Sequence, residues 1–226
     1  AALTPSGNLH GMPVASLFGD GPPELVGIGG FAPERPALRA SELRQIGIRS
    51  VDAGEKRLVH DAGIEVFDMR FIDEHGMRAT MERALAGVDA DTHLHVSLDV
   101  DFLDPSIAPG VATTVAGGPT YREAQLCMEM VADTGRLASL DIVEINPAYD
   151  THNNTAELAV DLVESLFGKS TLMREVLASC STIAPALRDS MYGKVCAPQS
   201  GPISSESHCV KLRAPRAPGR MRTRPR

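Results

Sequence analysis

The sequence has few aromatic residues, few cysteines and no long apolar segment. No apolar stretch approaches the length of a membrane-spanning helix, and the amino-terminal residues lack the basic and then apolar pattern of a secretion signal. Four cysteines in 226 residues, without zinc-ribbon spacing, argue against a disulfide framework or a structural zinc site. These absences predict a cytoplasmic protein with reduced thiols and no membrane partner.

Charge divides the chain into two unlike parts. Residues 1–172 carry 12 basic against 26 acidic side chains, a net charge of −14, whereas residues 173–226 carry 10 against 3, a net charge of +7. The second part ends in a proline- and arginine-rich run from Arg213 to Arg226, so we expect a disordered basic tail. No aromatic residue stands among these arginines, which argues against a specific nucleic-acid partner.

Strand and helix patterns alternate through residues 1–172, which we interpret as one α/β domain. The patterns predict strands at 43–48, 65–69, 93–100 and 138–145, and helices at 11–19, 55–62, 74–86, 121–132 and 155–167. This alternation is typical of a three-layer sandwich in which helices flank a mainly parallel central sheet. Ligands of such sheets bind outside the carboxyl ends of the strands. Four acidic residues are predicted at such ends: Asp52, Asp99, Asp101 and Glu144.

The most informative segment is Ser97-Leu98-Asp99-Val100-Asp101, in which an apolar strand ends in two acids. Side chains at positions i and i+2 of a strand point to the same face, which predicts that Asp99 and Asp101 lie side by side. Two adjacent carboxylates are stable when they share a proton or hold a cation, and oxygen ligands suit Mg²⁺, Mn²⁺ or Ca²⁺. The alternative interpretation is a solvated strand end whose acids cap the following turn.

Other segments extend this pattern along the chain, namely Ser6-Gly7-Asn8-Leu9-His10-Gly11, Pro109-Gly110, Gly117-Gly118-Pro119 and Asp141-Ile142-Val143-Glu144-Ile145-Asn146-Pro147. Taken together, residues 6–172 resemble arginases of the ureohydrolase family, and the Ser-Gly-Asn-Leu-His-Gly segment favours arginase within it. The resemblance implies an arginase/deacetylase-like sheet fold and a binuclear manganese cofactor. It also implies hydrolysis of L-arginine to L-ornithine and urea by metal-activated hydroxide, in a homo-oligomer that is a trimer or hexamer.

The resemblance also assigns roles to individual residues. Asp99 and Asp101 would hold the metal pair, with Asp99 also counted as catalytic. Glu144 would pair with the substrate guanidinium, and His10 would shuttle protons or orient the substrate. The α-carboxylate, the α-amino group and the pocket around them would be contacted by Ser6, Asn8, Asp52, Glu55 and Thr113. The Asp-x-Gly-Glu pattern that begins at Asp52 is also typical of a helix cap, so both interpretations of Asp52 stay open.

Two metal-binding segments of the family, Gly-Gly-Asp-His and Asp-x-His-x-Asp, do not occur before Ser6. We therefore expect an arginase-like domain that is incomplete at its amino terminus, with weak or no activity for this chain alone. One alternative is a non-catalytic fragment or assembly partner. Another is an agmatinase-like ureohydrolase, against which Ser6 and Asn8 argue, because agmatine lacks the α-carboxylate that these residues suit.

Overall fold

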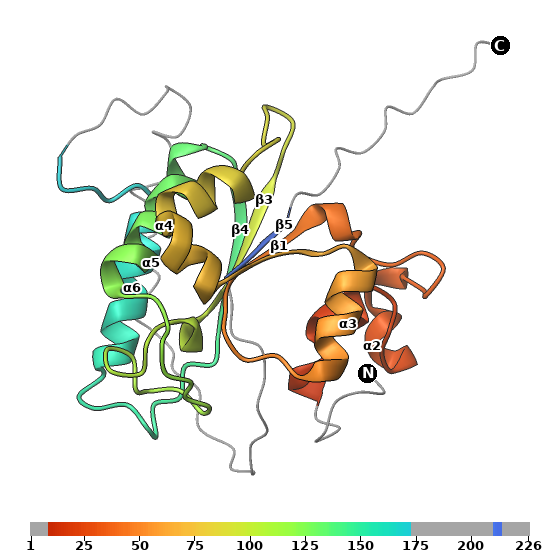
Figure 1. The fold of residues 1–226 in the computed structure, drawn as a ribbon, viewed down its shortest axis with the longest axis horizontal. Coiled ribbons are helices and arrows are strands. Elements are labelled where there is room, and N and C mark those ends of the chain that lie inside the picture. Colours follow the sequence, from red (N-terminus) through yellow and green to blue (C-terminus); the bar gives the residue numbers. More distant parts are fainter. Residues whose placement is uncertain (1–8, 173–209, 214–226) are drawn as a thin grey trace.

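Five strands and six α-helices make up the part of the chain that the computed structural model describes, residues 9–172 and 210–213 (Figure 1). The strands are β1 (Leu43–Ile48), β2 (Glu65–Asp68), β3 (Leu94–Asp99), β4 (Leu137–Val143) and β5 (Val210–Arg213). The helices are α1 (Pro13–Leu17), α2 (Pro23–Val26), α3 (Ala53–Ala62), α4 (Met69–Ala84), α5 (Tyr121–Asp133) and α6 (Asn154–Leu166). Within these described residues, no helix is long and apolar enough to cross a membrane.

The strands form a single sheet in the order β2-β1-β5-β3-β4. β1 pairs in parallel with β2, and β3 pairs in parallel with β4. β5 lies between β1 and β3 and runs antiparallel to both. β1 and β3 are therefore parallel to each other, and the carboxyl ends of β1 to β4 all lie at one edge of the sheet, which we call the carboxyl edge.

Helices cover both faces of this sheet. In Figure 1, α4, α5 and α6 lie on one side of the strands, and α2 and α3 lie on the other. The predicted fold class, a three-layer sandwich with a mainly parallel central sheet, is therefore confirmed. The largest difference in an element boundary concerns α4, which begins at Met69 rather than at residue 74. The reason is a helix cap, because the Asp68 carboxylate accepts a hydrogen bond from the Phe71 backbone N–H at 2.8 Å.

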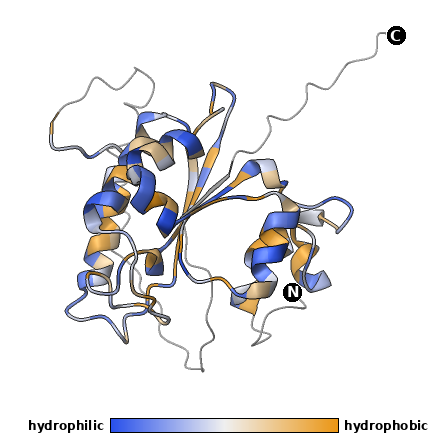
Figure 2. Ribbon diagram, in the orientation of Figure 1, coloured by the Kyte–Doolittle hydropathy of each residue, from blue (hydrophilic) through white to orange (hydrophobic). Residues whose placement is uncertain are grey.

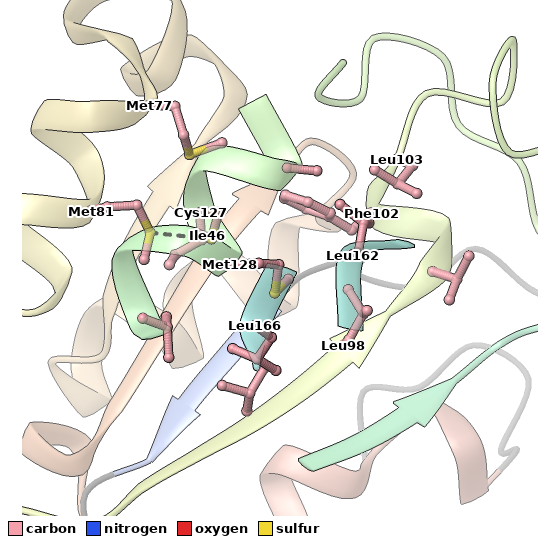
Figure 3. Packing of buried hydrophobic residues seen from close by; sticks show 14 of the residues in the cluster. Ile46, Met77, Met81, Leu98, Phe102, Leu103, Cys127, Met128, Leu162 and Leu166 are labelled. Carbon is pink, nitrogen blue, oxygen red and sulfur yellow. Dashed lines mark hydrogen bonds between the residues drawn. The ribbon is translucent and has the colours of Figure 1, made fainter. Parts of the chain in front are cut away.

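The main core lies between the sheet and α4, α5 and α6. Figure 3 shows side chains from the sheet facing side chains from these helices, and the fully buried ones include Ile46, Leu98, Phe102, Met81, Cys127, Met128, Leu162 and Leu166. The apolar residues of α5 gather on one side of the helix, and those of α6 do the same (Figure 2). Burial raises the pKa of the Cys127 thiol to about 12, which makes this cysteine an unreactive packing residue.

β5 belongs to the basic tail, for which the sequence predicts disorder. Its four residues pair with Leu43–Ile46 of β1 and with the segment 95–98 of β3. This segment departs from the predicted disorder because it joins the backbone ladders of β1 and β3, whose polar groups need partners inside a sheet. The remaining tail residues, 173–209 and 214–226, lie outside the described part of the chain, and for them disorder stays a prediction.

Candidate active site

Asp99 and Asp101 lie at the carboxyl edge, where β3 ends. Asp99 is the last residue of β3, and Asp101 lies in a 3₁₀ turn, Val100–Phe102. The Asp99 carboxylate accepts a hydrogen bond from the Asp101 backbone N–H at 3.4 Å. The expectation that both acids lie on the same face of one strand is therefore wrong for Asp101, because the strand ends at Asp99, whose side chain caps the turn.

Burial distinguishes between the two interpretations of these acids. Only 7% of Asp99 and 3% of Asp101 is exposed, so neither belongs to a solvated strand end. Taking a carboxylate out of water is unfavourable unless a cation or hydrogen-bond donors compensate for the lost hydration. Asp99 and Asp101 are thus buried carboxylates, the kind of oxygen donor that a hard cation prefers.

Arg49, which follows β1, is a half-buried cation bound to the same turn. Its Nη2 donates to the carbonyl oxygens of Asp101 at 2.8 Å and Leu103 at 3.2 Å, and its Nη1 donates to that of Phe102 at 3.0 Å. Its Nε donates to the Val115 carbonyl oxygen at 2.9 Å. Burial lowers the pKa of the guanidinium, although negative charges nearby, first that of Asp101, oppose this shift. Arg49 was not predicted as a site residue, and its only signal in the sequence is its position directly after a predicted strand.

A glycine brings β1 into contact with the turn. Gly47 has a φ of +82° and sits at a register shift between Ile46 and Ile48. A Cβ atom at Gly47 would lie 2.4 Å from two atoms of the Phe102 ring. The Phe102 side chain is fully buried, so the ring has little room to move away. The absent side chain at position 47 therefore lets β1 and the turn after β3 pack directly against each other.

The loop after the turn is held closed by Asp104. Its carboxylate accepts hydrogen bonds from the backbone N–H groups of Gly117 at 2.8 Å and Gly118 at 3.2 Å, and from both the hydroxyl and the backbone N–H of Ser106. These bonds, the Ser106 hydroxyl first, lower the pKa of Asp104 to about 2. A Cβ atom at Gly118 would lie 2.6 Å from the Asp104 nitrogen, which explains the glycine in this motif.

Asp104 makes the stability of this loop depend on pH. Because its pKa in the folded chain lies below the ordinary value of 3.8, its charged form contributes stability above about pH 4, and this contribution is lost as the pH falls toward 2. We expect Asp104→Asn to lower the free energy of unfolding at pH 7 by about 1 kcal/mol, a value reduced for solvent screening. Urea unfolding of both proteins should show this difference shrinking between pH 7 and pH 3. The same difference at both pH values, or an equal effect of Asp73→Asn at an exposed position of α4, would contradict this role.

Glu144 lies at the same edge, just after β4. It is half-buried and has a φ of +65°, a backbone conformation that non-glycine residues rarely adopt. The segment after it is tied to the loop after β3, since the Asn146 backbone N–H donates to the Gly110 carbonyl oxygen at 2.8 Å and Val111 forms a β-bridge with Ile145. Glu144 is thus held on a backbone that is fixed to the loop that follows the acid pair.

Asp52 and Glu55 form a helix cap at the start of α3. The Asp52 Oδ1 accepts hydrogen bonds from the N–H groups of Gly54 at 2.7 Å and Glu55 at 2.9 Å, and the Glu55 Oε2 accepts one from the Asp52 N–H at 3.0 Å. Of the two interpretations of Asp52, the structure therefore displays the cap. Its exposed position after β1 also leaves it at the carboxyl edge.

The remaining predicted residues are dispersed. His10 is exposed in a 3₁₀ turn, Leu9–Gly11, and Thr113 is half-buried in the loop after β3. Ser6 and Asn8 lie outside the described residues. The structure therefore brings Asp99, Asp101, Glu144 and Thr113 to strand ends or loops of one edge, and His10 lies in the first described turn of the chain.

The donor atoms at this edge are of the chemical type that manganese binds. Asp99 and Asp101 offer buried carboxylate oxygens, the ligands that hard divalent cations prefer. Over residues 9–172 and 210–213, however, no group of three or more histidine, cysteine, aspartate or glutamate side chains is placed to hold a metal ion. The His95 side chain, on β3, contacts β4 instead, since its Nε2 lies 2.9 Å from Asp141 Oδ2. The described residues thus fit part of a manganese site.

The fold and this edge place the chain in a class of proteins with a mainly parallel α/β sheet. In this class, ligands bind outside the carboxyl ends of the strands, and here that edge carries acidic side chains. The family model described as the arginase family matches residues 1–168. The chain belongs to the arginase family, which confirms the resemblance seen in the sequence motifs.

Individual relatives support the same assignment. The arginase of Brucella melitensis is 50% identical over 177 residues, which cover 77% of this chain and 56% of that protein. The arginase of Bacillus caldovelox is 45% identical over 173 residues, covering 76% and 57%. The crystal structure of arginase from Bacillus subtilis matches with a TM-score of 0.72 at 44% identity, covering 76% of this chain and 58% of that chain. This chain therefore spans somewhat more than half the length of these relatives.

Proposed function

We propose that this chain takes part in the manganese-dependent hydrolysis of the L-arginine guanidinium to L-ornithine and urea. The observation that carries the proposal is the buried acid pair, Asp99 and Asp101, at the carboxyl edge of a chain that matches an arginase structure with a TM-score of 0.72. The relatives that match this chain at 45–50% identity are named arginases. The metal, the substrate and the reaction are proposals for this chain.

In this proposal the residues divide the work by their chemistry. Asp99 and Asp101 hold manganese through carboxylate oxygens, and the bound metal supplies the activation of water at neutral pH. Glu144 pairs with the substrate guanidinium, a planar group that matches the two oxygens of a carboxylate. His10 moves protons, because an imidazole titrates near neutral pH. The two substituents on the substrate α-carbon are contacted by Ser6, Asn8, Asp52, Glu55 and Thr113.

The set of donors bears on how active this chain is by itself. Two carboxylates fit one part of a metal pair, and residues 9–172 and 210–213 assemble no larger group. We therefore propose that the chain alone turns over arginine slowly. We also propose that it functions in the cytoplasm as part of a homo-oligomer, a trimer or hexamer. The same observation favours the second candidate, a non-catalytic fragment or assembly partner.

Urea release tests the proposed reaction. The full chain, loaded with Mn²⁺, is expected to release urea from L-arginine and not from agmatine, and Asp99→Asn/Asp101→Asn is expected to release none. Urea and ornithine are measured separately, so that contaminating urea is recognised. Mn²⁺ uptake without urea release would favour the non-catalytic candidate, and equal release from agmatine would favour an agmatinase-like enzyme.

A further inference from the structure

Over the described residues, β1 and β3 are joined through β5. β5 pairs with Leu43–Ile46 of β1 and with the segment 95–98 of β3, and its first residue, Val210, lies opposite Ile46 and Leu98. Beyond that point, the described contacts between β1 and the turn after β3 are the packing of Gly47 on Phe102 and the hydrogen bonds of Arg49.

The hydrogen bonds of Arg49 are directed at the backbone that carries Asp101. Its guanidinium binds the carbonyl oxygens of three consecutive residues, Asp101, Phe102 and Leu103, and also that of Val115 from the end of the same loop. A planar guanidinium has five N–H donors in a fixed fork, which suits several acceptors at once. A lysine ammonium is a point charge and cannot span the same carbonyls.

We propose that Arg49 is a positioning residue for the acid pair. By fixing the backbone of the 3₁₀ turn against β1, it sets the position of the Asp101 carboxylate relative to Asp99, and through this the affinity of the pair for a divalent cation. Arg49 itself does not touch the cation in this proposal. The inference rests on the proposed function, in which the pair binds manganese.

The test compares Arg49→Lys, which keeps the charge but not the fork, with Arg78→Lys at an exposed arginine of α4. Amide hydrogen exchange of the metal-free proteins is followed by mass spectrometry. We expect exchange in residues 101–118 to become at least about tenfold faster in Arg49→Lys, while exchange in α5 and α6 keeps its wild-type rate. Arg78→Lys is expected to leave all of these segments unchanged.

Mn²⁺ titration by calorimetry supplies a second readout that a purely structural role would not change. Outer groups that orient metal ligands typically change metal affinity by about 10- to 100-fold, so Arg49→Lys is expected to weaken Mn²⁺ binding by at least about tenfold. Unchanged exchange in residues 101–118, or unchanged affinity where the wild-type chain binds Mn²⁺, overturns the inference.

The outcomes for the proposed function and for Arg49 stay distinct. A wild-type chain that takes up no Mn²⁺ contradicts the proposed function, and the exchange readout still decides whether Arg49 holds the turn. If Arg49→Lys does not fold by circular dichroism, Arg49→Gln replaces it, because the glutamine amide can still donate to part of the same carbonyl set. Wild-type exchange in Arg49→Gln would then overturn the inference.

Discussion

Replacing Gly47 by alanine is expected to lower the free energy of unfolding by about 3 kcal/mol. Two physical effects act together at this position. A left-handed backbone costs a residue with a Cβ atom about 1–2 kcal/mol, and an extra methyl group in a well-packed core typically costs about 1–3 kcal/mol. Both apply here, because Gly47 has a φ of +82° and its Cβ atom would lie 2.4 Å from the buried Phe102 ring. Urea unfolding monitored by circular dichroism measures the change.

Gly63 provides a matched control for the backbone effect alone. Its φ is +68°, and a Cβ atom there would meet nothing within 4 Å, so Gly63→Ala is expected to cost only about 1–2 kcal/mol. A double-mutant cycle isolates the clash, because the methyl group at position 47 should be tolerated once Phe102→Ala has removed the ring. Equal effects of Gly47→Ala and Gly63→Ala, or full additivity in the cycle, would show that the contact with Phe102 does not matter.

Replacing both acids, in Asp99→Asn/Asp101→Asn, is expected to weaken Mn²⁺ binding by about 100-fold or more. Two charged oxygen ligands are lost, and hard cations need ionised ligands. Thermal unfolding in the presence of a chelator shows whether the variant keeps its fold. A variant that is unfolded under these conditions would indicate that the acids serve the fold rather than a ligand.

Local patterns in the sequence were sufficient to predict most elements. The strand at 43–48 has the same bounds in the structure, where buried apolar residues, Leu43 and Ile48, stand at its two ends. The helix from Tyr121 was predicted at the right start, where Thr120 and Glu123 form a capping box that can be recognised in the sequence. Such features depend on neighbours along the chain, which is why the sequence alone reveals them.

The errors concern features that depend on contacts between distant segments. The strand that ends at Asp99 was extended to Val100, since the pattern does not show that the Asp99 side chain caps a turn. β5 was not predicted, because four tail residues form a strand only between the ladders of β1 and β3. Arg49 was missed for the same reason, since its carbonyl partners lie more than 50 residues away in the sequence.

The candidate site was also predictable only where it depends on local sequence. The types and order of its acids could be predicted from motifs, and the structure brings Asp99, Asp101 and Glu144 to one edge. The pattern at Asp52 had two interpretations, and only the positions of the Gly54 and Glu55 N–H groups reveal the cap. A cap and a substrate contact use the same carboxylate, so a sequence pattern cannot separate them.

The central claim is that the buried acid pair binds a divalent cation, and calorimetric titration of the full chain with Mn²⁺ tests it most directly. The wild-type chain is expected to give a saturable heat of binding that is absent for Asp99→Asn/Asp101→Asn, under conditions in which both proteins are folded by circular dichroism. Equal Mn²⁺ binding by the two proteins, or none by the folded wild-type chain, would contradict the account.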